Sequence, residues 1–85
     1  MTVLTTNEVL QMLADCFAEP VEEIIPGRAR DDIAGWDSMG ALMLMAELDE
    51  RCNLQLSAEQ SKRLRSVADV LDYLRAEQQL LEHGP

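Results

Sequence analysis

The segment Gly35-Trp36-Asp37-Ser38-Met39-Gly40 has residue types that could carry chemistry, because it places a serine hydroxyl at the first turn of a predicted helix. A phosphate ester on Ser38 would lie at the positive end of the helix dipole, near free backbone amides. Gly40 is a poor helix former at an interior position, and its small size would let another protein approach closely. In the simpler alternative, Asp37 or Ser38 only caps the helix, which is a common role for both residue types.

The residue types do not support nucleophilic catalysis by Ser38. A Ser-His-Asp site requires a histidine base, and a hydrolase elbow has the pattern G-x-S-x-G. The one histidine, His83, is in the tail, where we expect it to be solvated, and no such elbow is present. Ser38 is therefore predicted to be modified rather than to attack, and no enzymatic activity is predicted.

The cysteines do not indicate a metal site. Cys16 and Cys52 each lie among aliphatic residues at helical spacing, and neither has a second cysteine or a histidine nearby. Zinc sites need clusters of such ligands, and a disulfide scaffold of this size usually carries about four to eight cysteines. We expect both cysteines to be small buried hydrophobic residues.

Length and charge exclude several classes of protein. The 85 residues are predicted to form one domain, 1–85, and the apolar content of 47% argues against disorder. A net charge of −9 does not suit phosphate binding, so no nucleic-acid partner is expected. No apolar run approaches the roughly 20 residues of a membrane span, and no signal peptide is visible at the start. We therefore expect a cytoplasmic location.

Hydrophobic periodicity and capping signals predict an all-α fold: a small four-helix bundle with three main helices, one short helix and a long first loop. The expected helices span about 5–19, 37–52, 58–64 and 67–80. Pro20 is expected to end the first helix. No stretch alternates as a half-buried strand does, and residues 77–85 are expected to fray. The capping boxes that mark helix starts are Thr5 with Glu8, Ser57 with Gln60, and Ser66 with Asp69.

Residues 20–36 show no sustained period and contain two prolines and two glycines, which predicts a long loop. In a small domain, a loop of this length is usually functional or is packed down by its own apolar residues. Those residues are Ile24, Ile25, Ile33 and Trp36.

The second predicted helix is apolar nearly all round in its first half, where two stripes run along it. A helix on the outside of a small bundle buries one stripe, so the other is predicted to be exposed beside Ser38 as a recognition surface, a role that suits methionine. In the alternative, both stripes are buried between the other helices. The first stripe is Ala41, Leu44, Met45, Leu48 and Cys52, and the second is Met39, Leu42, Met43 and Ala46.

Negative charge is concentrated in the first part of the chain. Residues 1–50 hold eleven acidic and two basic residues, whereas residues 51–85 hold five of each. Asp49 and Glu50 lie toward the carboxyl end of the second helix, where the helix dipole disfavours anions. We interpret an acidic ring around an apolar patch as a docking surface for basic partners, with a solvated charged face as the simpler alternative.

These residues together resemble the acyl carrier proteins. Asp37-Ser38-Met39, preceded by Gly35-Trp36 and followed by an apolar and acidic helix, resembles the D-S-L motif of that family. The likeness extends from about residue 6 to residue 76. It includes Glu22-Glu23-Ile24, Leu54-Gln-Leu-Ser-Ala-Glu-Gln and Ser66-Val-Ala-Asp-Val-Leu-Asp-Tyr-Leu.

The resemblance implies a four-helix bundle whose serine carries 4'-phosphopantetheine from coenzyme A. By this match Ser38 is the attachment site, and Asp37 is the acidic neighbour that the transferase uses. The implied partners are a phosphopantetheinyl transferase, an acyl- or aminoacyl-loading ligase, and downstream synthase or transferase enzymes with basic docking patches; the chain itself is expected to be a monomer. The implied partner contacts are Trp36, Met39, Leu42, Met43, Ala46, Glu47 and Glu50.

Departures from the family pattern bear on the cargo. Met39 replaces the family leucine, and Met43 stands near a position where fatty-acid carriers have an acid. Trp36 before the motif is commoner in stand-alone or secondary-metabolism carriers. The leading hypothesis is therefore a carrier that holds an acyl intermediate as a thioester in a specialised lipid or polyketide pathway. Because Asp37-Ser38-Met39-Gly40 also looks like the D-alanyl carrier proteins, the alternative is a stand-alone aminoacyl carrier loaded by an adenylating ligase. A third hypothesis is an acidic helical interaction module without a prosthetic group.

Overall fold

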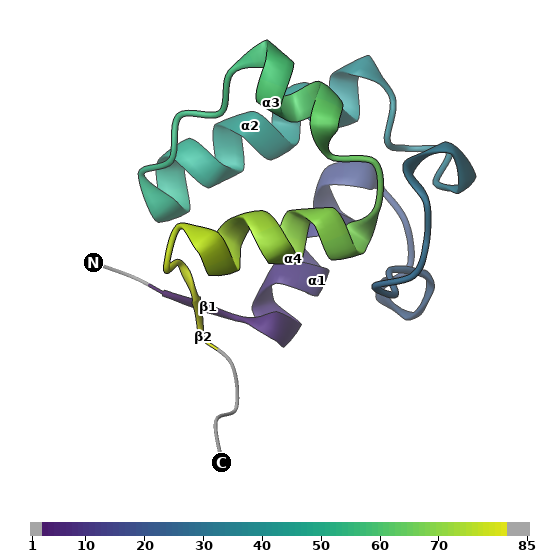
Figure 1. Cartoon of the computed structure of the whole chain (residues 1–85). Helices are drawn as coiled ribbons and strands as arrows, with labels where there is room; N and C mark the ends of the chain where they lie inside the picture. Colours follow the sequence, from purple (N-terminus) through teal and green to yellow (C-terminus); the bar gives the residue numbers. More distant parts are fainter. Residues whose placement is uncertain (1–2, 82–85) are drawn as a thin grey trace.

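Within residues 3–81, which the computed structural model describes, the fold consists of four α-helices and one pair of short parallel strands (Figure 1). The prediction of a small helical bundle is confirmed. None of the described helices is long and apolar enough to cross a lipid bilayer. The helices are α1 (Thr6–Phe17), α2 (Ser38–Cys52), α3 (Ala58–Arg63) and α4 (Val67–Ala76), and the strands are β1 (Leu4–Thr5) and β2 (Leu80–Leu81).

A side-chain cap marks the start of each of the four described helices, and three of these caps are predicted as capping boxes. At α1, the Glu8 amide donates to Thr5 Oγ1 (3.1 Å) and the Thr5 amide donates to Glu8 Oε1 (2.9 Å), so the predicted capping box is complete. The box predicted at α3 forms in the same reciprocal way. At α4 only half of the predicted box forms, because the Asp69 carboxylate accepts a hydrogen bond from the Arg65 amide instead of from the cap residue.

The end of α1 lies at Phe17 rather than at the predicted residue 19. Ala18 adopts the left-handed backbone conformation (φ 54°), and the amides of Ala18 and Glu19 both donate to the Ala14 carbonyl. This backbone cap ends the helix before Pro20 is reached. The predicted boundary is therefore wrong, because it attributes the stop to proline.

The end of α4 also comes earlier than predicted, at Ala76 rather than at residue 80. Gln78 takes the left-handed conformation (φ 59°), and the chain turns back on the helix. The Gln78 amide donates to the Arg75 carbonyl (3.1 Å), and the Gln79 amide donates to the Leu74 carbonyl (2.8 Å). Together these bonds form a capping motif that satisfies carbonyls of the last turn.

After α4 the chain forms a turn and a short strand up to residue 81, whereas the sequence predicts a frayed segment from residue 77. Leu80 pairs with Leu4 in the parallel ladder of β1 and β2, and the Leu4 amide donates to the Gln79 carbonyl (3.1 Å). The sequence does not reveal this pair, because strands of two residues are too short to show alternation. His83 lies outside the described residues.

The core contains one face each of α1, α2 and α4, together with buried residues of the loop. Cys16 and Cys52 are buried free thiols, as predicted. Burial raises the pKa of the Cys16 thiol to about 11, and the Glu47 carboxylate adds to this effect. Burial likewise raises the pKa of the Cys52 thiol. The largest fully buried side chains include Phe17, Met12, Leu13, Ile24, Leu44, Leu48 and Leu74.

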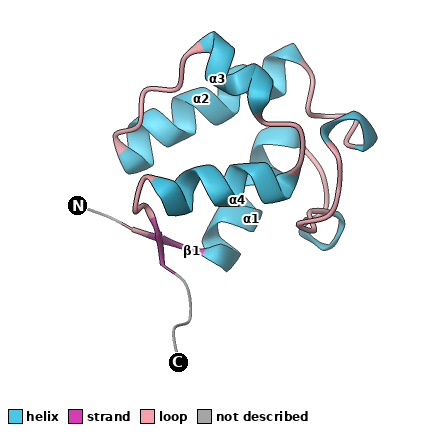
Figure 2. Ribbon diagram, viewed as in Figure 1, coloured by secondary structure: helices cyan, strands magenta, loops and turns pink. Residues whose placement is uncertain are grey.

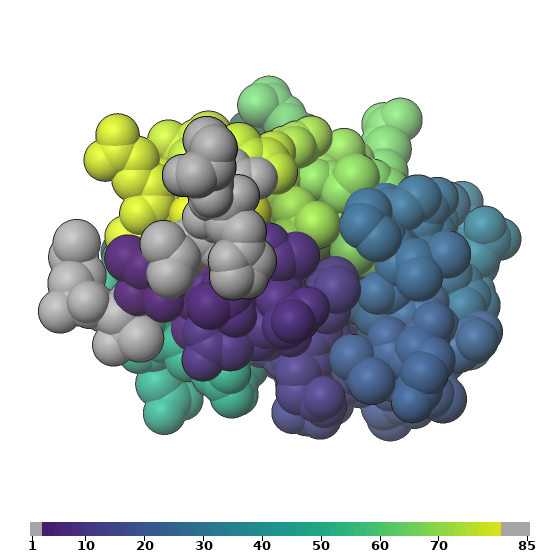
Figure 3. All heavy atoms as spheres, turned by 90° about the horizontal axis from the view of Figure 1, so that it is seen from below, coloured from purple at the N-terminus to yellow at the C-terminus, as the bar shows by residue number. Residues whose placement is uncertain are grey.

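The connection between α1 and α2 is the long loop that the sequence predicts, and it contains two 3-10 turns, η1 (Val21–Glu23) and η2 (Arg30–Asp32) (Figure 2). Ile24, Ile33 and Trp36 are buried, which confirms the predicted packing for these three, whereas Ile25 is exposed. In the space-filling view, the loop makes up one side of the molecule next to α1 (Figure 3).

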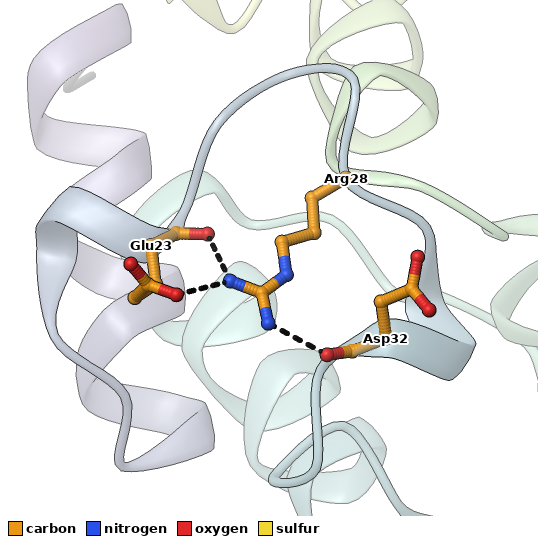
Figure 4. A network of polar contacts seen from close by, with 3 residues as sticks. All are labelled: Glu23, Arg28 and Asp32. Atoms are coloured by element: carbon orange, nitrogen blue, oxygen red, sulfur yellow. Dashed lines mark hydrogen bonds and ion pairs between the residues drawn. The ribbon is translucent and has the colours of Figure 1, made fainter.

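Arg28 joins the two turns of this loop (Figure 4). Its Nη1 donates to the Glu23 carbonyl (3.1 Å) and pairs with Glu23 Oε1 (2.7 Å), while its Nη2 donates to the Asp32 carbonyl (2.8 Å). Because a guanidinium makes several directed hydrogen bonds at once, one side chain holds both turns in place.

The loop also caps the start of α4. The Val67 amide donates to the Arg28 carbonyl (3.1 Å), and the Ala68 amide donates to the Pro26 carbonyl (2.9 Å). The first amides of a helix have no acceptor within that helix. The loop supplies these acceptors, and the contact keeps it against the bundle.

Ionisation of Cys16 is predicted to make stability fall between about pH 9 and pH 11. Below this range the thiol is protonated in both states and has no effect. Within it, the unfolded thiol loses its proton at its ordinary pKa of 9.0, while the folded thiol, with a pKa of about 11, retains it. The free energy of unfolding should have fallen by about 2–3 kcal/mol at the upper end of this pH range.

Chemical denaturation of the wild type and of Cys16→Ala across this range measures the effect, and the variant should show the shallower decline. Equal declines would contradict the assignment of a raised pKa to this thiol.

Candidate functional site

Ser38 is the first residue of α2, and its side chain is exposed. The residue before it, Asp37, is the N-cap: its backbone is extended, and its Oδ1 accepts a hydrogen bond from the Gly40 amide (2.9 Å). Of the two residues that could cap the helix, Asp37 therefore has this role. The Ser38 hydroxyl lies at the surface, at the start of the helix.

The electrostatic environment of Ser38 is that of a helix N-terminus. The amides of Ser38 and Met39 come before the first intrahelical hydrogen bond, in which the Ala41 amide donates to the Asp37 carbonyl (2.9 Å). Such amides and the helix dipole give a positive potential. An anionic group on the Ser38 hydroxyl is therefore favoured at this position.

Two glycines let the start of α2 pack closely on the end of α1. A Cβ atom at Gly40 would collide with the Gly35 carbonyl oxygen and lie 3.0 Å from Phe17 Cδ1. A Cβ atom at Gly35 would collide with the Phe17 carbonyl oxygen. The interpretation of Gly40 as room for an approaching protein is therefore wrong, because groups of the same chain fill that space.

Trp36, which the resemblance implies as a partner contact, is a core residue with 4% of its surface exposed. Its ring stacks on Phe17, with ring centroids 4.8 Å apart and 16° between the planes. The Arg30 guanidinium lies over the indole, 5.5 Å from its centroid. As a correction, Trp36 is left out of the docking surface, because a side chain enclosed in this way does not reach a partner. It anchors the end of the loop just before the site.

Arg30 connects Trp36 to the end of α3. Its Nη1 donates to the Ser61 carbonyl (3.2 Å), and its backbone amide donates to the Arg65 carbonyl (2.7 Å). Sequence reasoning missed Arg30, since a single arginine in a loop has no spacing that marks it. Its role depends on residues that are about thirty positions away in the chain.

The two apolar stripes of α2 have different surroundings. Ala41, Leu44, Leu48 and Cys52 are buried, and Met45 is half-buried. The second stripe is the exposed stripe: 68% of Met39, 57% of Leu42 and 49% of Met43 are accessible, and Ala46 is also exposed. This confirms that one stripe faces solvent and excludes the alternative in which both are buried. Contiguous exposed apolar side chains of this kind are typical of interaction surfaces.

Acidic residues continue this face toward the end of α2. Glu47 is half-buried and pairs with Arg51 one turn later, with 2.6 Å between the carboxylate oxygen and the guanidinium Nε. Glu50 is exposed. By helical spacing, Glu47 and Glu50 follow Met43 on the same side of the helix. The structure thus brings Ser38, the exposed stripe and these two carboxylates onto one helix.

Comparison with known proteins finds similarity along most of the chain. No protein-family model matches it. The chain is 26% identical to an acyl carrier protein of Syntrophus aciditrophicus over 69 residues, which is 81% of this chain and 86% of the relative. It is 28% identical to one of Rickettsia bellii over 70 residues (81% and 80%). It is 25% identical to one of Thermosynechococcus vestitus over 68 residues (80% and 84%).

Removal of the N-cap is predicted to destabilise the protein. Asp37→Ala should lower the free energy of unfolding by about 1 kcal/mol, because the Gly40 amide loses its acceptor. Asp37→Asn keeps a side-chain oxygen at the same place and should cost much less. Denaturation of both variants measures the difference, and equal losses would argue against the capping role.

A methyl group at Gly40 is predicted to destabilise the protein by about 1–3 kcal/mol, although alanine is the better helix former. The new Cβ would collide with the Gly35 carbonyl, which is backbone and cannot rotate away. Gly27→Ala is the matched control, because a Cβ there meets no atom within 4 Å. Urea denaturation of the two variants is the measurement; a Gly40→Ala protein as stable as the control would refute the close contact.

Proposed function

We propose that this chain, a member of the acyl carrier protein family as its relatives and its helical fold support, carries a 4'-phosphopantetheine group on Ser38. Members of this family are carriers rather than catalysts, and they typically bear this group. The observation that carries the proposal is the exposed Ser38 hydroxyl, which directly follows the N-cap Asp37 and does not itself cap the helix.

The residues around Ser38 suit the attachment of a phosphate ester. The hydroxyl is accessible, and the amides of Ser38 and Met39 supply positive potential. In the transfer, the Ser38 oxygen forms a bond to the β-phosphorus of coenzyme A and the pyrophosphate bond breaks. 3',5'-ADP leaves, and the hydroxyl proton passes to a base on the transferase. We assign Asp37 as a contact for the transferase, because its exposed carboxylate lies one residue before the acceptor.

The chain's own residues present the prosthetic group and form the surface that partners recognise. When bound, the group supplies a flexible tether whose thiol holds a carboxylic acid as a thioester. The exposed stripe, which starts with Met39 beside Ser38, suits an apolar recess on a partner. Glu47 and Glu50 suit basic residues around that recess. A small contact surface of this kind favours quick release, which a carrier that visits several enzymes requires.

The partners follow from the same surface. Family membership implies synthase and transferase enzymes as partners. For this chain we propose a phosphopantetheinyl transferase, a ligase that loads the cargo, and downstream enzymes with basic docking patches. The exposed charges of α2 would speed the encounter with such patches.

For the cargo, we propose an acyl group of a specialised lipid or polyketide pathway. The apolar character of α2 around Met43 supports this choice. An aminoacyl cargo is the second candidate, favoured by the string Asp37-Ser38-Met39-Gly40. A loading assay on the holo protein separates the two: charging by an adenylating ligase with amino acids alone favours the second, and charging with fatty or polyketide acyl groups favours the first.

Arm transfer to Ser38 is the central prediction. Apo protein incubated with coenzyme A and a broad-specificity phosphopantetheinyl transferase should gain the mass of one phosphopantetheinyl group. Ser38→Ala should remain folded, because the side chain is exposed and Asp37 supplies the cap, but it should gain nothing. Asp37→Asn, which keeps the cap, should gain the group more slowly.

Intact mass spectrometry with a time course gives all three results. A wild-type protein that gains no mass, or a Ser38→Ala protein that does, would reject the proposed attachment.

A further inference from the structure

The lysine and arginine side chains fall into two groups according to their contacts. The chain has seven of them. Arg28, Arg30, Arg51 and Arg75 each bind groups of the same chain through hydrogen bonds or ion pairs. Each of these four therefore has a role within the fold.

The other three cations, Lys62, Arg63 and Arg65, form a surface that we term the cationic edge. All three are exposed, and within residues 3–81 their side chains have no hydrogen-bond or ion-pair acceptor. Leu64, which lies between them, is buried and holds the segment against the core. The fold thus fixes the backbone of the cationic edge, while within the described residues its three charges enter no ion pair.

The cationic edge lies close to the site because Arg30 holds both ends of its segment. The Ser61 carbonyl accepts from the Arg30 guanidinium, and the Arg65 carbonyl accepts from the Arg30 amide. The same guanidinium lies over Trp36, two residues before Ser38. In Figure 1 the chain after α3 runs beside the loop that leads into α2. These contacts connect the segment of the cationic edge to the end of the loop that leads into Ser38, and an enzyme whose contact surface extends from Ser38 across this junction would also cover the cationic edge.

Stabilisation of α3 does not account for all three cations. Lys62 and Arg63 lie in its last turn, where cations interact favourably with the helix dipole. Arg65 lies beyond the helix, and α3 has only six residues. The helix dipole therefore accounts for Lys62 and Arg63 but not for Arg65.

The charge of the chain determines which partner fits. A net charge of −9 repels free polyanions and attracts basic surfaces from a distance. A uniformly basic partner, however, would be repelled by the cationic edge when it covers Ser38. A partner with basic residues opposite α2 and carboxylates opposite the cationic edge is complementary to both surfaces. Because the two surfaces carry opposite charges, such a partner binds in only one orientation.

We propose that the phosphopantetheinyl transferase that acts on Ser38 places carboxylates against Lys62, Arg63 and Arg65. This inference rests on the proposed function, because it requires an enzyme that modifies Ser38. The acidic part of α2 brings the two proteins together, and the cationic edge orients the chain so that the Ser38 hydroxyl faces the catalytic site of the transferase.

The kinetics of arm transfer at low ionic strength test this inference. In the triple variant Lys62→Gln, Arg63→Gln, Arg65→Gln, the KM for the apo protein should rise about five- to tenfold with kcat nearly unchanged, since the lost ion pairs act in docking. The difference should shrink at high salt. Arg63→Gln and Arg75→Gln form a matched pair with the same change in net charge, and only the first should raise the KM, by about twofold. Denaturation curves check that each variant is folded.

The outcomes separate the two proposals. If the chain recognised only basic surfaces on its partners, the loss of cations would lower the KM instead of raising it. A KM that falls or stays constant in the triple variant would overturn the cationic edge, while transfer to wild-type Ser38 would leave the proposed function in place. No transfer to the wild type would reject both.

Discussion

The close contact between the start of α2 and the end of α1 is the constraint on which the site depends. It exists because neither Gly35 nor Gly40 has a side chain, so the Gly35 backbone fits against both Phe17 and the first turn of α2. Trp36 follows at once and stacks on Phe17. The loop therefore enters α2 with its last residues held from inside, and Asp37 is the first residue after them that reaches the surface.

The size of the domain explains why α2 has one apolar face inside and another outside. A chain of 85 residues buries one modest core, and α1, α4, the loop and the inner face of α2 fill it. Covering the outer face would require a further layer. Apolar residues there, such as Met39 and Leu42, contribute little to folding, and contact with other molecules accounts for them better.

Sequence patterns within single helices predict much of the fold. The features that these patterns do not predict depend on contacts between residues that are far apart in the chain. The capping box of Thr5 and the two stripes of α2 can be predicted because the residues involved lie within a few turns of one helix. The burial of Trp36 depends on Phe17, and the β1–β2 pair joins the two ends of the described chain. At the candidate site, residue type and order predict that Asp37 and Ser38 lie at the start of α2, and the structure places both there. The packing role of Gly40 and the link made by Arg30 require the folded structure.

Asp37 and Ser38 are neighbours that could each cap α2, and the residue that does not cap the helix keeps its side chain available for another role. Aspartate and serine are both good N-caps, and a helix that began one residue later would use the Ser38 side chain to bind an amide. Packing on the inner side favours the earlier start, because Trp36 is fixed in the core and Gly40 must face Gly35. With this register the Asp37 carboxylate binds the amide of Gly40. The internal packing of the loop thereby leaves the serine hydroxyl exposed, which is what a covalent attachment site requires.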